Sequence, residues 1–131
     1  MIGPNAQHSY YLYDGPADMR KSFDGLCGLV RNGLDRNPAN GEVFVFLNRK
    51  RDMIKLLLWD RSGFVIYCKR LEQGTFEQPT RKGHHGGIQL SWSELMLILE
   101  GIALDSVKQR KRYVLQGKLL SLAQKSESCP L

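Results

Sequence analysis

The sequence has no long hydrophobic run, although 42% of its 131 residues are hydrophobic. No stretch approaches the roughly 20 apolar residues that a membrane-spanning helix needs. The first five residues also lack the basic and apolar regions of a secretory signal peptide. We therefore expect a cytoplasmic protein without a membrane partner, and its length favours a single domain.

Cysteine is scarce, and the positions of the cysteines suggest no common disulfide or metal site. Cys27, Cys68 and Cys129 are far apart in the sequence and form no C-x-x-C pair. An odd number of widely spaced cysteines indicates neither a disulfide framework nor a zinc site. Cys27 and Cys68 lie in apolar patterns, where free thiols are commonly buried.

No pattern typical of catalysis is present. Metal-dependent nucleases gather carboxylates around divalent ions, whereas the acidic residues here suit turns, a helix cap and a hairpin. We expect no three of the following to converge on one metal: Asp18, Asp24, Asp52 and Asp60. His84 and His85 are adjacent but lack a spaced third ligand, which favours a solvated loop over a metal site. The sequence therefore predicts no enzyme, metal or cofactor.

Positive charge exceeds negative charge, and the excess is uneven. The net charge is +6 and the isoelectric point is near 9.4. Residues 1–41 hold four basic and four acidic residues, residues 42–80 hold seven and five, and residues 81–131 hold eight and four. A basic surface of this kind suits a polyanionic partner, because binding releases condensed counterions.

Two segments have the apolar period of an amphipathic helix. In 18–35, apolar residues recur at steps of three and four, and Asp18 is placed to cap the helix. The second segment begins with a capping box, in which Ser91 is followed three residues later by Glu94. Its apolar positions are Leu95, Ile98, Leu99 and Ile102.

Several short runs rich in β-branched and aromatic residues predict strands. Three consecutive runs with tight connections, 42–47, 53–59 and 64–71, favour an antiparallel β-meander. Shorter strands are expected at 8–13 and 88–90. The fold class is therefore α+β: a single domain over 8–104 with an antiparallel meander and two amphipathic helices.

Alternation of side chains assigns the two faces of the meander. We expect Lys55 and Lys69 to share the less buried face with Trp59 and Tyr67. Such a face resembles the basic and aromatic sheets that stack unpaired bases. The alternative, which we favour, is that the second helix covers the aromatic residues while the lysines extend to solvent.

The opposite face of the meander is expected to be the core. We place Phe23 and Val30 of the first helix against Leu56 and Ile66 of the strands. Beyond the domain, 105–131 is a basic segment, either an amphipathic helix or a chain that orders only with a partner, with 126–131 disordered.

The basic residues are the main candidates for a binding surface. A hairpin tip at 49–51 can reach phosphates, although plain solubility would explain its charge equally well. The full set of candidate DNA-binding residues is Arg20, Lys21, Arg49, Lys50, Arg51, Lys55, Lys69, Arg70, Arg110, Lys111 and Arg112.

Four strings, taken together and in this order, resemble a known family. They are residues 18–26 (DMRKSFDGL), 43–55, 59–76 and 99–102 (LEGI). They are similar to the small accessory proteins of TnpB type encoded by the second reading frame of IS66 insertion sequences. The RNA-guided nucleases that share the TnpB name are unrelated.

The resemblance implies a role in transposition beside a separate transposase, and it brings no catalytic residue. It covers about residues 8–104 and is silent on the C-terminal segment. The leading hypothesis is a non-catalytic factor that associates with the DNA of the element ends. The alternative is an adaptor that docks on the transposase without touching DNA. The sequence does not give the oligomeric state.

Overall fold

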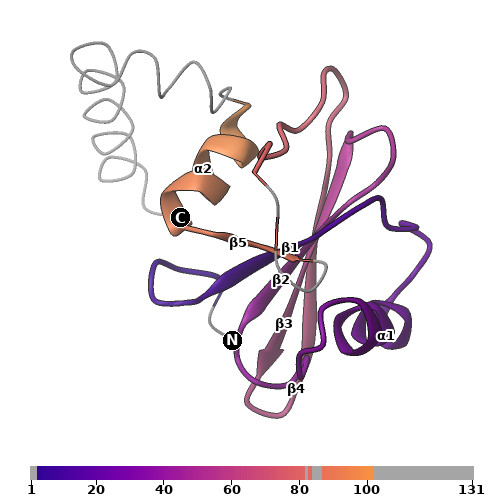
Figure 1. The fold of residues 1–131 in the computed structure, drawn as a ribbon, viewed down its shortest axis with the longest axis vertical. Helices are drawn as coiled ribbons and strands as arrows, with labels where there is room; N and C mark the ends of the chain where they lie inside the picture. The colour runs from indigo at the N-terminus through magenta and orange to yellow at the C-terminus, as the bar shows by residue number, and fades with distance from the viewer. Residues whose placement is uncertain (1–2, 82, 84–86, 102–131) are drawn as a thin grey trace.

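A computed structural model describes residues 3–81, 83 and 87–101 of the chain. They form one five-stranded sheet in the order β4-β3-β2-β1-β5, with α1 and α2 on opposite sides (Figure 1). The elements in chain order are β1 (Tyr10–Tyr13), α1 (Phe23–Gly33), β2 (Val43–Leu47), β3 (Met53–Asp60), β4 (Gly63–Arg70), β5 (Gly87–Leu90) and α2 (Trp92–Glu100).

The α+β class and the single domain are confirmed. The β-meander is also confirmed for β2, β3 and β4, which pair antiparallel in sequence order. The sheet is nevertheless mixed, because β1 pairs parallel to β2 and antiparallel to β5. Parallel pairing of consecutive strands requires a long crossover, and the segment containing α1 supplies it.

Strand β2 lies at the centre of the sheet and separates two cores. All five of its residues are buried, and its apolar run has no polar alternation because helices cover both faces. Val43 and Val45 join the cluster that contains Leu95 and Ile98 of α2. On the opposite face, Phe44 and Phe46 join Leu26, Cys27 and Val30 of α1.

The predicted sharing of faces between β3 and β4 was wrong. Lys55 pairs with Cys68, and Ile54 pairs with Lys69, so the two lysines lie on opposite faces. The physical reason is the turn: Asp60 and Gly63 are paired, leaving only two residues between the strands. A shift of register by one residue moves every side chain of a strand to the other face.

The expected core contacts change with this register. Val30 is fully buried and Ile66 packs partly against the same cluster, as predicted. Leu56 is buried on the α2 side instead, in the other cluster. Phe23 is 44% exposed, since it is the first residue of α1. The expectation of a buried Cys68 was also wrong, because its thiol is exposed at the edge of the sheet.

The two helices start differently from one another. In α2 the predicted capping box is confirmed, with Ser91 Oγ accepting from the Glu94 amide at 3.1 Å and the Glu94 carboxylate accepting from the Ser91 amide at 3.1 Å. Helix α1 begins at Phe23, so Asp18 is not its cap. The carboxylate of Asp18 instead accepts from the backbone and side chain of Arg20.

Candidate nucleic-acid interface

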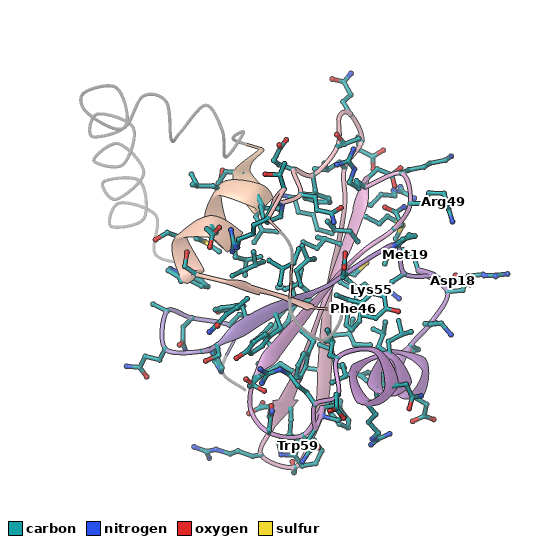
Figure 2. All side chains as sticks on the ribbon, viewed as in Figure 1. Asp18, Met19, Phe46, Arg49, Lys55 and Trp59 are labelled. Atoms are coloured by element: carbon teal, nitrogen blue, oxygen red, sulfur yellow. The ribbon has the colours of Figure 1, made fainter. Side chains whose placement is uncertain are left out.

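One end of the sheet collects the loops that carry most of the predicted basic residues. Because β1 and β2 run parallel, both end there, together with the start of β3 and the end of β4. Figure 2 shows Arg49 and Asp18 on this side of the molecule, away from Trp59 at the other end of β3. We call this the basic end; its candidate residues are Arg20, Lys21, Arg49, Lys50, Arg51 and Arg70.

The hairpin between β2 and β3 is braced by its own polar side chains. Asn48 Oδ1 accepts from the amides of Asp52 at 3.0 Å and Met53 at 3.1 Å, while Asn48 Nδ2 donates to Asp52 Oδ1 at 2.6 Å. Arg51 adopts a left-handed backbone conformation with φ 58°. These contacts shape the tip without using the side chains of 49–51, which are all exposed.

The loop after β1 is attached to the same end of the sheet. The Ala17 amide donates to the Leu47 carbonyl at 2.8 Å, next to the hairpin. From β3, the Lys55 ammonium donates to the carbonyls of Met19 at 2.8 Å and Lys21 at 2.9 Å. Lys55 therefore positions the loop that carries Arg20 and Lys21. Its ammonium is already hydrogen-bonded to backbone carbonyls of that loop.

Arg20 forms an ion pair within this loop. Its guanidinium donates to both carboxylate oxygens of Asp18, with Nε to Oδ1 at 3.1 Å and Nη2 to Oδ2 at 2.7 Å. The side-chain and backbone hydrogen bonds from Arg20 lower the pKa of Asp18 to about 2. The Arg20 side chain remains 91% exposed, so its outer face is open to a ligand although its charge is shared.

The two basic residues that end β4 point to different partners. The Lys69 ammonium donates to the Leu99 carbonyl at 3.1 Å, on the α2 side of the sheet. A cation at this place complements the carbonyl end of α2. Arg70 forms an exposed ion pair with Glu72 at 3.2 Å. Lys69 is therefore not part of the basic end, whereas Arg70 lies there in an ion pair with Glu72.

The remaining cations lack an acidic partner in the part of the chain that the structure describes. Asp18 and Glu72 pair with arginines, and Asp52 is bonded to Asn48. No described carboxylate forms an ion pair with Lys21, Arg49, Lys50 or Arg51. Uncompensated positive charge therefore gathers on the hairpin tip and the adjacent loop.

The basic and aromatic stacking surface, the less favoured of the two possibilities, does not form. Trp59 packs edge-on against Phe64, with ring centroids 4.9 Å apart, at the end of the sheet opposite the hairpin. Tyr67 lies on the other face and lines an apolar groove beside Leu56, Trp92 and α2. Cover by the second helix, the favoured alternative, is what the structure shows for Tyr67.

Within residues 3–81, 83 and 87–101, no group of three His, Cys, Asp or Glu side chains could hold a metal ion. In the same part of the chain, no helix is long and apolar enough to cross a membrane. His84 and His85, and the candidate cations Arg110, Lys111 and Arg112, lie outside the described residues.

Comparison with known proteins identifies the family. The profile described as IS66 Orf2 like protein matches residues 8–109. The chain belongs to the IS66 Orf2-like family. It is 33% identical over 110 residues to the uncharacterized protein y4jC of Sinorhizobium fredii, covering 84% of this chain and 92% of that protein. It is 35% identical over 92 residues to the uncharacterized protein y4hO of the same organism, covering 70% and 78%. No solved structure matches the chain.

Membership of the IS66 Orf2-like family makes this an accessory protein of an insertion sequence. The uncharacterized relatives assign no residue a role. The DNA-binding set therefore stays a prediction, and the structure adds only how its members are placed. It brings six of them to the basic end and gives Lys55 and Lys69 contacts inside the fold.

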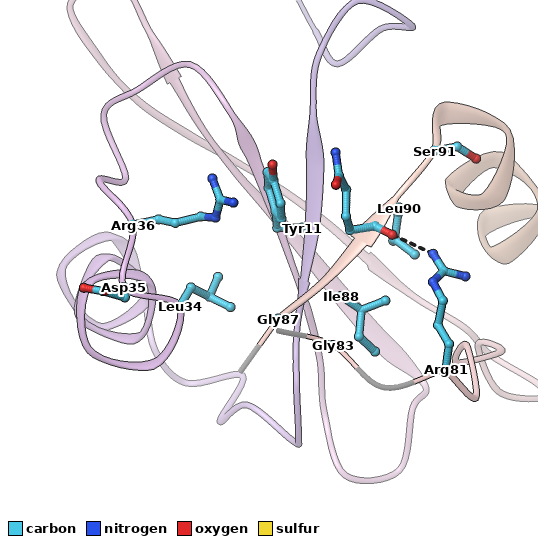
Figure 3. Close-up of a pocket in the computed structure, with 11 residues that line it drawn as sticks. Tyr11, Leu34, Asp35, Arg36, Arg81, Gly83, Gly87, Ile88, Leu90 and Ser91 are labelled. Carbon is cyan, nitrogen blue, oxygen red and sulfur yellow. Dashed lines mark hydrogen bonds between the residues drawn. The ribbon is translucent and has the colours of Figure 1, made fainter. Parts of the chain in front are cut away.

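Sequence reasoning missed two arginines that organise the other side of this IS66 Orf2-like protein. Arg36 lies 3.7 Å over the ring of Tyr11 and pairs with Glu42 at 3.0 Å. Arg81 donates to the Glu94 carboxylate and to the Gln89 carbonyl. Figure 3 shows both beside a cleft of about 870 Å³. No sequence signal marks these residues, because their carboxylate partners lie six and thirteen positions away.

Two titratable groups beside these arginines, the Glu94 carboxyl and the Tyr11 hydroxyl, have shifted pKa values. Burial alone would raise the pKa of Glu94, but hydrogen bonds from Arg81 and Ser91 outweigh it and lower that pKa. Burial, followed by the charge of Glu42, raises the pKa of the Tyr11 hydroxyl. Arg36 and Arg81 thus form ion pairs that stabilise the domain. In this they differ from the cations of the basic end that have no described acidic partner.

Proposed function

We propose that this protein is a non-catalytic accessory factor of transposition that contacts DNA through its basic end and works with a separate transposase. The observation that supports this most is the placement of Lys21, Arg49, Lys50 and Arg51. They extend from two braced loops at one end of the sheet without a described acidic partner.

Loops of this kind suit the DNA backbone better than base edges. Phosphate contacts come from exposed Lys and Arg side chains and carry no sequence information directly. Each neutralised phosphate releases counterions, so the affinity depends steeply on salt. The hairpin tip is held by Asn48 and Asp52, which lets its three cations meet phosphates with little further ordering. We therefore assign the basic end to positioning on DNA, with sequence choice left to the transposase.

The absence of catalysis is part of the proposal. Asp18 and Asp52, two of the carboxylates nearest the basic end, are already engaged by Arg20 and Asn48. A two-metal nuclease needs such oxygens free to bind cations at about 2.0–2.6 Å. Incubating the protein with DNA and Mg²⁺ or Mn²⁺ should give no cleavage, and metal-dependent cleavage would contradict this assignment.

The decisive experiment compares two DNAs and two partners. Purified protein is titrated against DNA of the element ends and against random DNA, each with and without transposase. Lys50→Gln removes one charge from the basic end, and Arg61→Asn removes one from the hairpin at the opposite end as the matched control. Asn is chosen because residue 61 has φ 53°, a conformation that Asn tolerates.

The proposal expects Lys50→Gln to weaken binding to both DNAs alike and Arg61→Asn to leave it unchanged. An adaptor that meets acidic patches on the transposase would behave differently. In that case neither DNA is bound directly, and Lys50→Gln weakens only the capture of transposase. That result would overturn the DNA contact while keeping the accessory role.

A further inference from the structure

The two outer strands of the sheet differ in how their free edges are protected. On β5, which has four residues, Arg81 Nη2 donates to the Gln89 carbonyl at 2.6 Å, and Glu94 holds the same guanidinium. Strand β4 has eight residues and, among the described residues, pairs only with β3. Its outer edge is therefore a row of unpaired backbone donors and acceptors, which is the usual template for another strand.

Residues 63–68, the first six of strand β4, also lack the side-chain features that normally keep an edge from pairing. The strand contains no proline, and its register with β3 runs without a bulge from Gly63 to Arg70. Gly63–Tyr67 carries no charge, and its apolar side chains are only partly buried. Proteins usually blunt an edge with charge, proline, a bulge or a short strand. Here the only charges lie in the last two residues, Lys69 and Arg70.

We propose that the outer edge of β4 pairs antiparallel with β4 of a second copy of this chain. The charge pattern favours this partner, because antiparallel pairing sets Lys69 and Arg70 of each copy beside the uncharged start of the other. Parallel pairing would instead align like charges. The pairing would cover the partly exposed Phe64, Val65, Ile66 and Tyr67 on both faces of the sheet, and cross-strand apolar pairs stabilise such contacts.

The same geometry separates the basic ends of the two copies. The hairpin at 48–52 lies at the end of the sheet where β4 finishes. Antiparallel β4 strands therefore place the two basic ends at opposite ends of one continuous sheet, where their charges do not oppose association. If the basic end binds DNA as proposed above, the pair presents two DNA-binding ends; the self-association itself does not depend on that function.

Sedimentation of the full chain without DNA tests the proposal over a wide range of concentrations. The unaltered protein should reach twice the 14.9 kDa chain mass. Val65→Lys, which adds a charge in the middle of the β4 edge, should stay monomeric with its thermal melt retained. Gln89→Lys makes the matched change on the protected β5 edge and should still form the pair. A monomer at every concentration, or a pair lost through Gln89→Lys and not through Val65→Lys, would overturn the proposal.

A second measurement uses the unaltered chain, since Val65 is partly buried and its replacement could act through the fold. Cys68 is exposed on β4, whereas Cys27 is buried. Alkylation of Cys68, followed by mass spectrometry of its peptide, should slow severalfold as the protein is concentrated into the paired state. A rate that is independent of concentration would overturn the proposal. DNA binding by a strictly monomeric protein would also overturn the proposed β4 pairing, but it would be consistent with the proposed function.

Discussion

At the level of single residues, Lys55 connects the sheet to the loop that presents Arg20 and Lys21. Its ammonium donates to the carbonyls of Met19 and Lys21 from a partly buried position near the start of β3. A hydrogen bond from a charged group contributes more than a neutral one. Lys55 therefore acts on any ligand of the basic end indirectly, through the position of the loop.

Replacing Lys55 with Met should lower the free energy of unfolding by about 1–3 kcal/mol, because two backbone acceptors lose a charged donor. Urea denaturation measures this change. Lys50→Met is the control, since Lys50 is exposed and has no described acidic partner; it should change stability by less than about 0.5 kcal/mol. Equal effects of the two substitutions would contradict the bracing role of Lys55.

The ion pair of Asp18 and Arg20 makes a prediction about pH. The folded pKa of Asp18 is lowered to about 2 from an ordinary value of 3.8. The pair's contribution is therefore fully present above the ordinary value and is lost as the pH falls toward 2. A carboxyl NMR titration should give a midpoint near 2 for Asp18, and Arg20→Gln should return it toward 3.8. A midpoint near 3.8 in the unaltered protein would show that the pair does not form.

At the level of elements, α1 and β2 show how burial depends on position within an element. Phe46 lies in the central strand, belongs to the core on the α1 side and is fully buried. Phe23, at the start of α1, remains 44% exposed. The two phenylalanines therefore differ in what their removal should cost.

Phe46→Ala should destabilise the domain by about 3–5 kcal/mol, the usual effect of emptying a fully buried aromatic site. Phe23→Ala should cost less than about 1 kcal/mol, because much of that ring already faces water. Chemical denaturation of the two variants side by side measures both values. Similar losses in the two variants would mean that the first turn of α1 packs more deeply than the structure shows.

Local signals in the sequence predicted the elements well, and contacts between elements less well. The capping box at Ser91 and the β-branched and aromatic runs depend on neighbours within a few residues, and the cap and the strands are confirmed. The predicted start of α1 was wrong because the Asp18 carboxylate accepts from the Arg20 amide instead of capping the helix. Sequence spacing does not distinguish these two local roles of an aspartate. The β3–β4 register was wrong because it depends on a two-residue turn rather than on the polarity of Lys55 and Lys69.

At the level of the whole molecule, the crossover through α1 determines where the candidate site lies. Parallel pairing of β1 with β2 brings the loop after β1 to the same end of the sheet as the basic hairpin. The sequence singled out the individual basic residues but did not predict that the two loops lie at the same end of the sheet. That proximity depends on which strands pair across a long sequence separation. Likewise, Arg36 and Arg81 could not be told apart from free cations until their carboxylate partners were seen.

The central claim is that the hairpin tip at 49–51 contacts phosphates, and the salt dependence of DNA binding tests it most directly. Affinity for duplex DNA is measured at several salt concentrations for the unaltered protein and for the variant with Arg49, Lys50 and Arg51 replaced by Ala. The slope of log K against log salt should fall by up to about three, because each phosphate contact contributes roughly 0.9. Binding to all sequences should weaken alike, and the melting temperature should be kept. A variant that retains both its affinity and its slope would contradict the account.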